Sequence, residues 1–94
     1  MATFDKLVKR LRQAHRESDL HRRVCGDFLE DHGINVERAS GGEVTDPNVE
    51  AKLANLADQG DKTARQLRAR LREVDTQVAN ATRDLANTIG QPGG

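Results

Sequence analysis

Four side chains in the first quarter of the chain have the chemistry of metal ligands: His15, Glu17, Asp19 and His21. Imidazole and carboxylate groups hold transition metals when several of them converge on one point. On a helix, Glu17 and His21 share one face and His15 and Asp19 share another, because residues four apart are neighbours. A di-metal site in a helical bundle also needs Glu-x-x-His pairs on facing helices, and the sequence contains none. We therefore expect no metal and no cofactor, and assign His21 to a packing stripe.

Cys25 is the only cysteine, and it follows Arg22 and Arg23. Nearby positive charge lowers the pKa of a thiol and favours the reactive thiolate. A nucleophilic cysteine also needs a base and a site for the developing anion, and the sequence identifies neither. It likewise contains no phosphate-binding glycine loop and no Gly-x-Ser-x-Gly. We expect a buried thiol that packs as a small apolar side chain, in a cytoplasmic protein that is not an enzyme.

Arginine is the residue type best supplied for binding a ligand. The candidate anion-binding residues are Arg10, Arg12, Arg65, Arg68 and Arg72. Guanidinium groups bind phosphates through paired N–H donors, so this set supports an alternative hypothesis, a sequence-independent nucleic-acid-associated protein. The competing interpretation is a set of solvent-exposed faces paired with nearby acids. The scarcity of aromatic side chains and a pI of 6.8 favour that interpretation.

The stretch that organises the chain covers residues 67–89. Apolar or small residues recur there at alternating spacings of four and three, at Leu67, Leu71, Val74, Val78, Ala81, Leu85 and Thr88. This heptad pattern predicts a long helix whose narrow apolar stripe packs on another helix. The pattern predicts packing and not chemistry.

A matching stripe runs along the first third of the chain, through Phe4, Leu7, Leu11, Ala14, Ser18, His21, Cys25 and Phe28. It predicts a helix over about residues 3–32 that begins with Thr3 as N-cap. Gly33 should end this helix, with Ile34 folding back in a Schellman motif. Ser18 and His21 give the stripe a polar centre, and Gly26 indicates a close approach of another helix.

The second helical region opens with Asp46-Pro47, a specific signal for a helix start. Its stripe through Val49 and Leu53 slips by one residue at Gly60. Two alternatives follow: one helix over about residues 47–89, about 65 Å long at 1.5 Å per residue, or a break at Gly60 with Asp61 capping a new helix. We favour the continuous helix. Residues 33–46 then form a loop, and residues 90–94 a disordered tail.

Together these elements predict an all-α fold, an antiparallel hairpin of two long helices in a single domain over residues 1–89. With 94 residues, 35% hydrophobic composition and no Trp or Tyr, the core must be thin. Two helices leave apolar side chains uncovered, so we expect dimerisation into a four-helix bundle. The residues expected at the interface are Phe4, Leu7, Leu11, Val24, Phe28, Leu67, Leu71, Val74, Val78 and Leu85.

The net charge is zero, but the charged residues are distributed unevenly along the chain. Residues 1–24 carry seven Lys and Arg against three Asp and Glu, residues 25–61 carry two against nine, and residues 62–94 carry six against three. The hairpin therefore has basic segments along its length and an acidic loop end. No window has the length and apolarity of a membrane span. The sequence thus predicts a non-enzymatic interaction or assembly module whose partner is a second copy or another protein.

Overall fold

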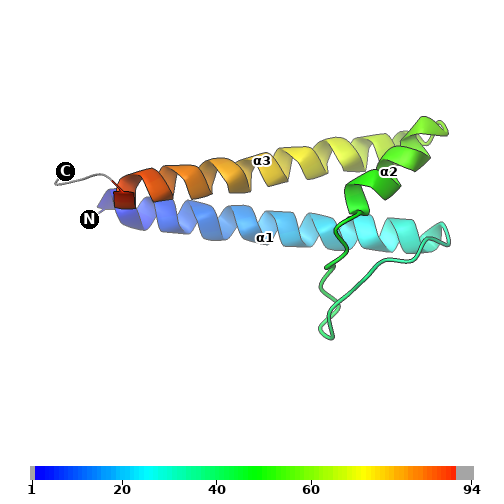
Figure 1. Ribbon diagram of the computed structural model, residues 1–94, viewed down its shortest axis with the longest axis horizontal. Helices are drawn as coiled ribbons and strands as arrows, with labels where there is room; N and C mark the ends of the chain where they lie inside the picture. Colours follow the sequence, from blue (N-terminus) through cyan, green and yellow to red (C-terminus); the bar gives the residue numbers. More distant parts are fainter. Residues whose placement is uncertain (1, 91–94) are drawn as a thin grey trace.

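The structure, a computed structural model, describes residues 2–90. It consists of α1 (Ala2–Asp31), α2 (Val49–Asp58) and α3 (Lys62–Gly90). The two long helices, α1 and α3, lie antiparallel, and α2 covers one end of the pair after the intervening loop has folded back along α1 (Figure 1). Within the described residues β pairing is limited to one isolated bridge, Arg38 with Val44. The all-α class and the antiparallel pair are confirmed, and dimerisation stays a prediction.

The second helical region is divided at Gly60, so the favoured continuous helix over residues 47–89 is wrong. Gly60 has a φ of +98°, and the N–H groups of Gly60 and Asp61 donate to the carbonyls of Ala57 and Leu56 at 3.0 and 3.1 Å. This is the Schellman pattern that ends a helix. Asp61 then caps α3, because its Oδ1 accepts the N–H of Ala64 at 2.8 Å. The one-residue slip in the stripe was the sequence signal of this break.

The first helix ends where the sequence predicts. Gly33 has a φ of +75°, and the N–H of Ile34 reaches back to the carbonyl of Leu29 at 3.0 Å. The Ile34 side chain packs against the buried core, which completes the Schellman motif. At the other end α1 already includes Ala2, so Thr3 lies inside the helix and is not its N-cap.

Two predicted boundaries in the second region also differ. Here α2 begins at Val49, and Asn48, with no side-chain cap, takes the N-cap position predicted for Asp46. The Asp46 carboxylate is instead shared between the loop and Lys52, so Pro47 belongs to a turn before the helix. At the C-terminus α3 includes Gly90, which the predicted tail had placed outside the helix. The rest of that tail lies outside the described residues.

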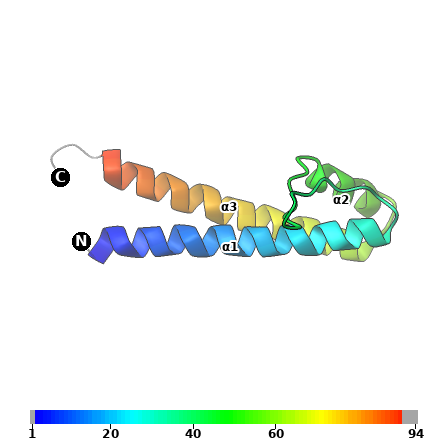
Figure 2. The same ribbon diagram turned by 90° about the horizontal axis from the view of Figure 1, so that it is seen from below.

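The buried core lies at the end where three helices meet. It contains Cys25, Leu29, Val44, Val49, Leu53, Ala57, Ala64, Leu71 and Val74. The three buried residues of α2, Val49, Leu53 and Ala57, recur every four residues, so one face of this short helix lies on the long pair. Figure 2 shows α2 and the loop together on one side of α1 at this end. The molecule is elongated, 53 × 29 × 17 Å, and only α1 and α3 continue to the other end.

Polar side chains join α1 to α3 near mid-length. Ser18 Oγ donates to Asp75 Oδ1 at 3.2 Å, and Arg22 donates to both oxygens of the same carboxylate at 3.0 and 2.9 Å. His21 Nε2 lies 2.8 Å from the carbonyl oxygen of Leu67, so this nitrogen carries a proton and donates it. The polar centre predicted for the first stripe is therefore a set of hydrogen bonds to α3.

Gly26 allows the loop to approach α1, and not another helix as the sequence analysis predicted. A Cβ at this position would lie 2.8 Å from Val44 Cγ2 and 2.9 Å from a guanidinium nitrogen of Arg38. Arg38 reaches from the loop to α1 and donates to Asp27 and Glu30 at 2.8 Å each. The small residue therefore makes room for the contacts that hold the loop on the helix.

We expect Gly26→Val to lower the free energy of unfolding by about 2 kcal/mol, because the new side chain overlaps Val44 and displaces Arg38. Urea denaturation followed by circular dichroism measures this loss. Gly41→Val is the matched control, since nothing lies within 4 Å of a Cβ there and the φ of Gly41 is not positive. An equal loss in both variants would contradict the close approach.

Candidate functional site

The two ends of the α1–α3 pair differ in how well their apolar side chains are covered. Residues eighteen apart on a helix are five turns apart and point in the same direction. Leu29 is fully buried, whereas Leu11, eighteen residues earlier on α1, is only half-buried. On α3, Leu71 is 1% exposed and Ile89, eighteen residues later, is 68% exposed. The same side of the pair is therefore covered at one end and open at the other.

We call residues 4–17 of α1 and 77–89 of α3 the two-helix end. Its small side chains Ala14 and Ala81 are buried where the helices meet. Its larger apolar side chains are half-buried or exposed, namely Phe4, Leu7, Val8, Leu11, Val78, Leu85 and Ile89. Among the described residues no third element packs over them, and we call this set of apolar side chains the apolar face of the two-helix end.

The residues predicted for an interface fall into three groups. Leu71 and Val74 belong to the core of the three-helix end, and Phe28 and Leu67 pack against it. Val24 is 51% exposed on the outer side of α1. The remaining members lie on the apolar face of the two-helix end: Phe4, Leu7, Leu11, Val78 and Leu85. Only this last group and Val24 remain available to a partner, because the others are used within the chain.

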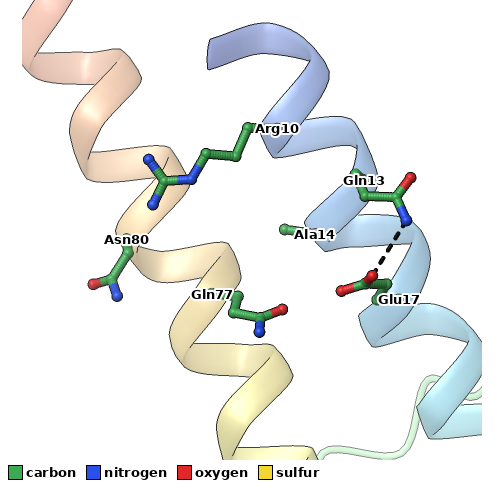
Figure 3. A pocket seen from close by; sticks show the side chains of 6 residues that line it. All are labelled: Arg10, Gln13, Ala14, Glu17, Gln77 and Asn80. Carbon is green, nitrogen blue, oxygen red and sulfur yellow. Dashed lines mark hydrogen bonds between the residues drawn. The ribbon is translucent and has the colours of Figure 1, made fainter. Parts of the chain in front are cut away.

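A shallow depression lies between α1 and α3 at the two-helix end (Figure 3). Its lining is Arg10, Gln13, Ala14, Glu17, Gln77 and Asn80. Arg10 pairs with Asp84 at 2.7 Å, and Gln13 Nε2 donates to Glu17 Oε1 at 3.2 Å. The groups that line this depression can form hydrogen bonds and ion pairs. The depression therefore offers polar contacts to a ligand or partner.

The structure separates the candidate anion-binding arginines. Besides Arg10, two others face an acid: Arg72 lies 2.7 Å and Arg68 3.7 Å from Glu50 Oε1. The hydrogen bond from Arg72 and the charge of both arginines hold the pKa of Glu50 below its ordinary value. Arg12 and Arg65 are exposed, and neither forms an ion pair with any described residue. The five arginines thus lie on two helices in different surroundings, and anion binding by them stays a prediction.

Arg12 instead belongs to a group that the sequence analysis did not assemble. A shallow depression on the outer side of α1 is lined by Arg12, His15, Arg16, Asp19, Leu20 and Arg23, all of them exposed. The sequence signal was Leu20, an apolar residue outside the packing stripe with arginines three and four positions away. The structure shows which side of α1 is buried, and so shows that this group faces solvent.

The His, Asp, Glu and Cys side chains considered for metal binding or thiol chemistry do not come together in one site. In residues 2–90 no group of three or more His, Cys, Asp or Glu is arranged to hold a metal ion. Cys25 is fully buried, and burial raises its pKa to about 11, against the charge of Arg22, which lowers it. The thiol is therefore protonated at neutral pH, and its electropositive neighbours do not produce a thiolate.

Comparison of the chain with family models, with curated proteins and with solved structures finds no match. Among the described helices none has both the length and the apolar character needed to cross a membrane. Two surfaces of the chain are therefore the candidates for a functional site, namely the two-helix end and the outer side of α1.

A buried carboxylate holds the loop to α2. Asp46 accepts hydrogen bonds from Lys52 Nζ, from the N–H of Asn48 at 2.8 Å and from the N–H of Glu37 at 3.2 Å. The hydrogen bond from Lys52, supported by the backbone donors, holds the pKa of Asp46 below its ordinary value. Lys52 Nζ also donates to the carbonyl of Asn35 at 2.8 Å. The two ends of the loop are thereby tied to one point.

We expect Asp46→Asn to cost about 2 kcal/mol of unfolding free energy at pH 7, because a neutral amide replaces a carboxylate bound by charged and backbone donors. Folding lowers the pKa of Asp46, so its contribution is complete above the pKa of the unfolded chain and is lost as the pH falls through the folded-state pKa. The difference between wild type and variant should therefore shrink at about pH 3.

Urea denaturation at both pH values measures this difference. Asp58→Asn, at an exposed position on α2, is the control and should change little at either pH. A cost for Asp46→Asn that is the same at both pH values would show that the Asp46 carboxylate contributes by packing alone.

Proposed function

We propose that this chain is a non-enzymatic helical interaction module that self-associates through its two-helix end. The observation that carries the proposal is the contrast between Leu71 and Ile89, which point in the same direction but are 1% and 68% exposed. At the three-helix end, α2 covers this side of the pair. At the two-helix end the apolar side chains remain in contact with water, and their burial by another surface is favourable by about 25 cal/mol per Å².

A second copy of the chain is the partner that supplies a matching surface. In a two-fold dimer the same patch lies on both sides of the interface, so the apolar face of the two-helix end packs on itself. The α1 and α3 helices of the two copies then enclose one core, as in a four-helix bundle. In this arrangement the partner's helices cover the apolar side chains of the two-helix end, as α2 covers those at the other end.

The size of this face indicates a weak dimer. Fourteen residues at 1.5 Å each give a length of about 20 Å, and two helices side by side have a width of about 20 Å. Two copies would therefore bury on the order of 800 Å², below the ~1,200–2,000 Å² of stable interfaces. We expect a reversible dimer with a dissociation constant in the micromolar range.

Charge makes the self-association sensitive to salt in a defined direction. Residues 4–17 carry five Lys and Arg against two Asp and Glu, and residues 77–89 carry one of each kind, so each two-helix end has a net charge of +3. Two such ends repel one another, and salt screens the repulsion. The dimer should therefore become stronger as the salt concentration rises.

Sedimentation equilibrium tests this proposal. Ile89→Glu places a charge in the interface at a position that is exposed in the monomer, so it should weaken the dimer at least about tenfold without changing helicity. Leu20→Glu is the control, because Leu20 is similarly exposed but lies on the outer side of α1. A monomer at about 500 µM chain in high salt, or an equal effect of both variants, would refute self-association through this face.

A further inference from the structure

A second surface combines positive charge with exposed aliphatic side chains. We call it the outer α1 face, and define it by Arg12, Arg16, Leu20, Arg23 and Val24. Leu20 is 58% exposed, and neither it nor Val24 contributes to the core. All five residues are exposed, and none of them belongs to the apolar face of the two-helix end. The fold itself gives no reason for two aliphatic residues at these positions.

The arginines of this face are not balanced by carboxylates. Elsewhere in the described residues most arginines pair with acids, as Arg10, Arg22, Arg38, Arg70 and Arg72 do, and Arg65 is the exception. Arg12, Arg16 and Arg23 form no ion pair with any described residue, although Asp19 lies among them. With Asp19 included and His15 neutral, the lining of this depression carries a net charge of +2.

The spacing of the charged groups matches a partner that runs along α1. Arg12 and Arg16 are four residues apart, about 6 Å along the axis, and Arg16 and Arg23 are seven residues apart, about 10 Å. These are the distances of one and two turns of a second helix, which can therefore present one carboxylate to each guanidinium. Guanidinium groups bind carboxylates through two parallel hydrogen bonds, which makes such pairing specific in direction.

The aliphatic residues decide which class of anion suits this surface. Leu20 and Val24 lie one turn apart, and each gains when an apolar side chain covers it. Phosphate groups gain nothing from these two residues. The depression on this face contains no Phe, Tyr or Trp on which a base could stack, and His15 is its one aromatic ring. The combination favours an acidic and partly apolar peptide over a nucleic acid.

We propose that the outer α1 face binds an acidic amphipathic segment of a partner protein. Carboxylates of that segment pair with Arg12, Arg16 and Arg23, and its aliphatic side chains pack on Leu20 and Val24. Because this surface shares no residue with the apolar face of the two-helix end, a dimer of the chain presents two such faces.

Fluorescence anisotropy with a labelled helical peptide tests the proposal. The probe carries Glu and Leu at helical spacing, one control peptide has Lys in place of Glu, and another has Gln in place of Leu. We expect saturable binding of the probe alone. Arg16→Glu/Arg23→Glu should weaken that binding at least about tenfold, and Leu20→Gln should weaken it as well.

The matched control is Lys62→Glu/Arg65→Glu, which changes the net charge by the same amount on exposed residues of α3 and should leave binding within about twofold. Circular dichroism confirms that each variant keeps its helices. The single variants Arg16→Glu and Arg65→Glu repeat the comparison with half the change in charge.

Salt separates this proposal from self-association. Binding of the acidic peptide should weaken as salt rises, whereas the dimer should strengthen, and Ile89→Glu should affect only the dimer. Absence of peptide binding, an equal loss with both double variants, or tighter binding of duplex DNA than of the acidic peptide at the same salt concentration would each overturn the proposal.

Discussion

The reversal of the chain at Gly60 determines where this molecule has a core. Two helices in contact bury one narrow strip of side chains, and a third surface is needed before large residues are fully enclosed. The Schellman turn at Gly60 and the cap of Asp61 supply that surface, because they lay α2 back across α1 and α3. Continued as a straight helix, the same ten residues would project away from the pair and leave Val49 and Leu53 in water.

Specific polar contacts then fix how the elements sit on one another. A heptad stripe alone allows two helices to slide by one repeat, since the next apolar residue replaces the last. The Asp75 carboxylate prevents this, because only one alignment places it beside both Ser18 and Arg22. The loop is fixed in the same way, by Arg38 to α1 and by Asp46 to α2. Apolar burial thus supplies the stability and these hydrogen bonds select the arrangement.

Structural features that depend on neighbouring residues along the chain were predicted from the sequence. Features that depend on contacts between distant residues were not. The periodicity of α1 and α3 and the stop at Gly33 are local patterns, and they were right. The break at Gly60 was the less favoured of two alternatives because a glycine inside a helix costs only about 1 kcal/mol, and burial of α2 against the long helices decides the outcome. The ion pair between Arg72 and Glu50, twenty-two residues away, likewise could not be predicted from the sequence. The outer α1 face could be recognised only once the buried side of α1 was known.

The placement of the core at one end also sets an order in which the molecule opens. Local unfolding starts where few apolar side chains are enclosed, and here that is the two-helix end, where both termini of the described chain lie (Figure 1). Backbone amides should therefore exchange with solvent fastest there and slowest around Leu29 and Leu53. The surface that we propose for self-association is the part of the chain least held in place, so pairing and local ordering of these helix ends would form one coupled equilibrium.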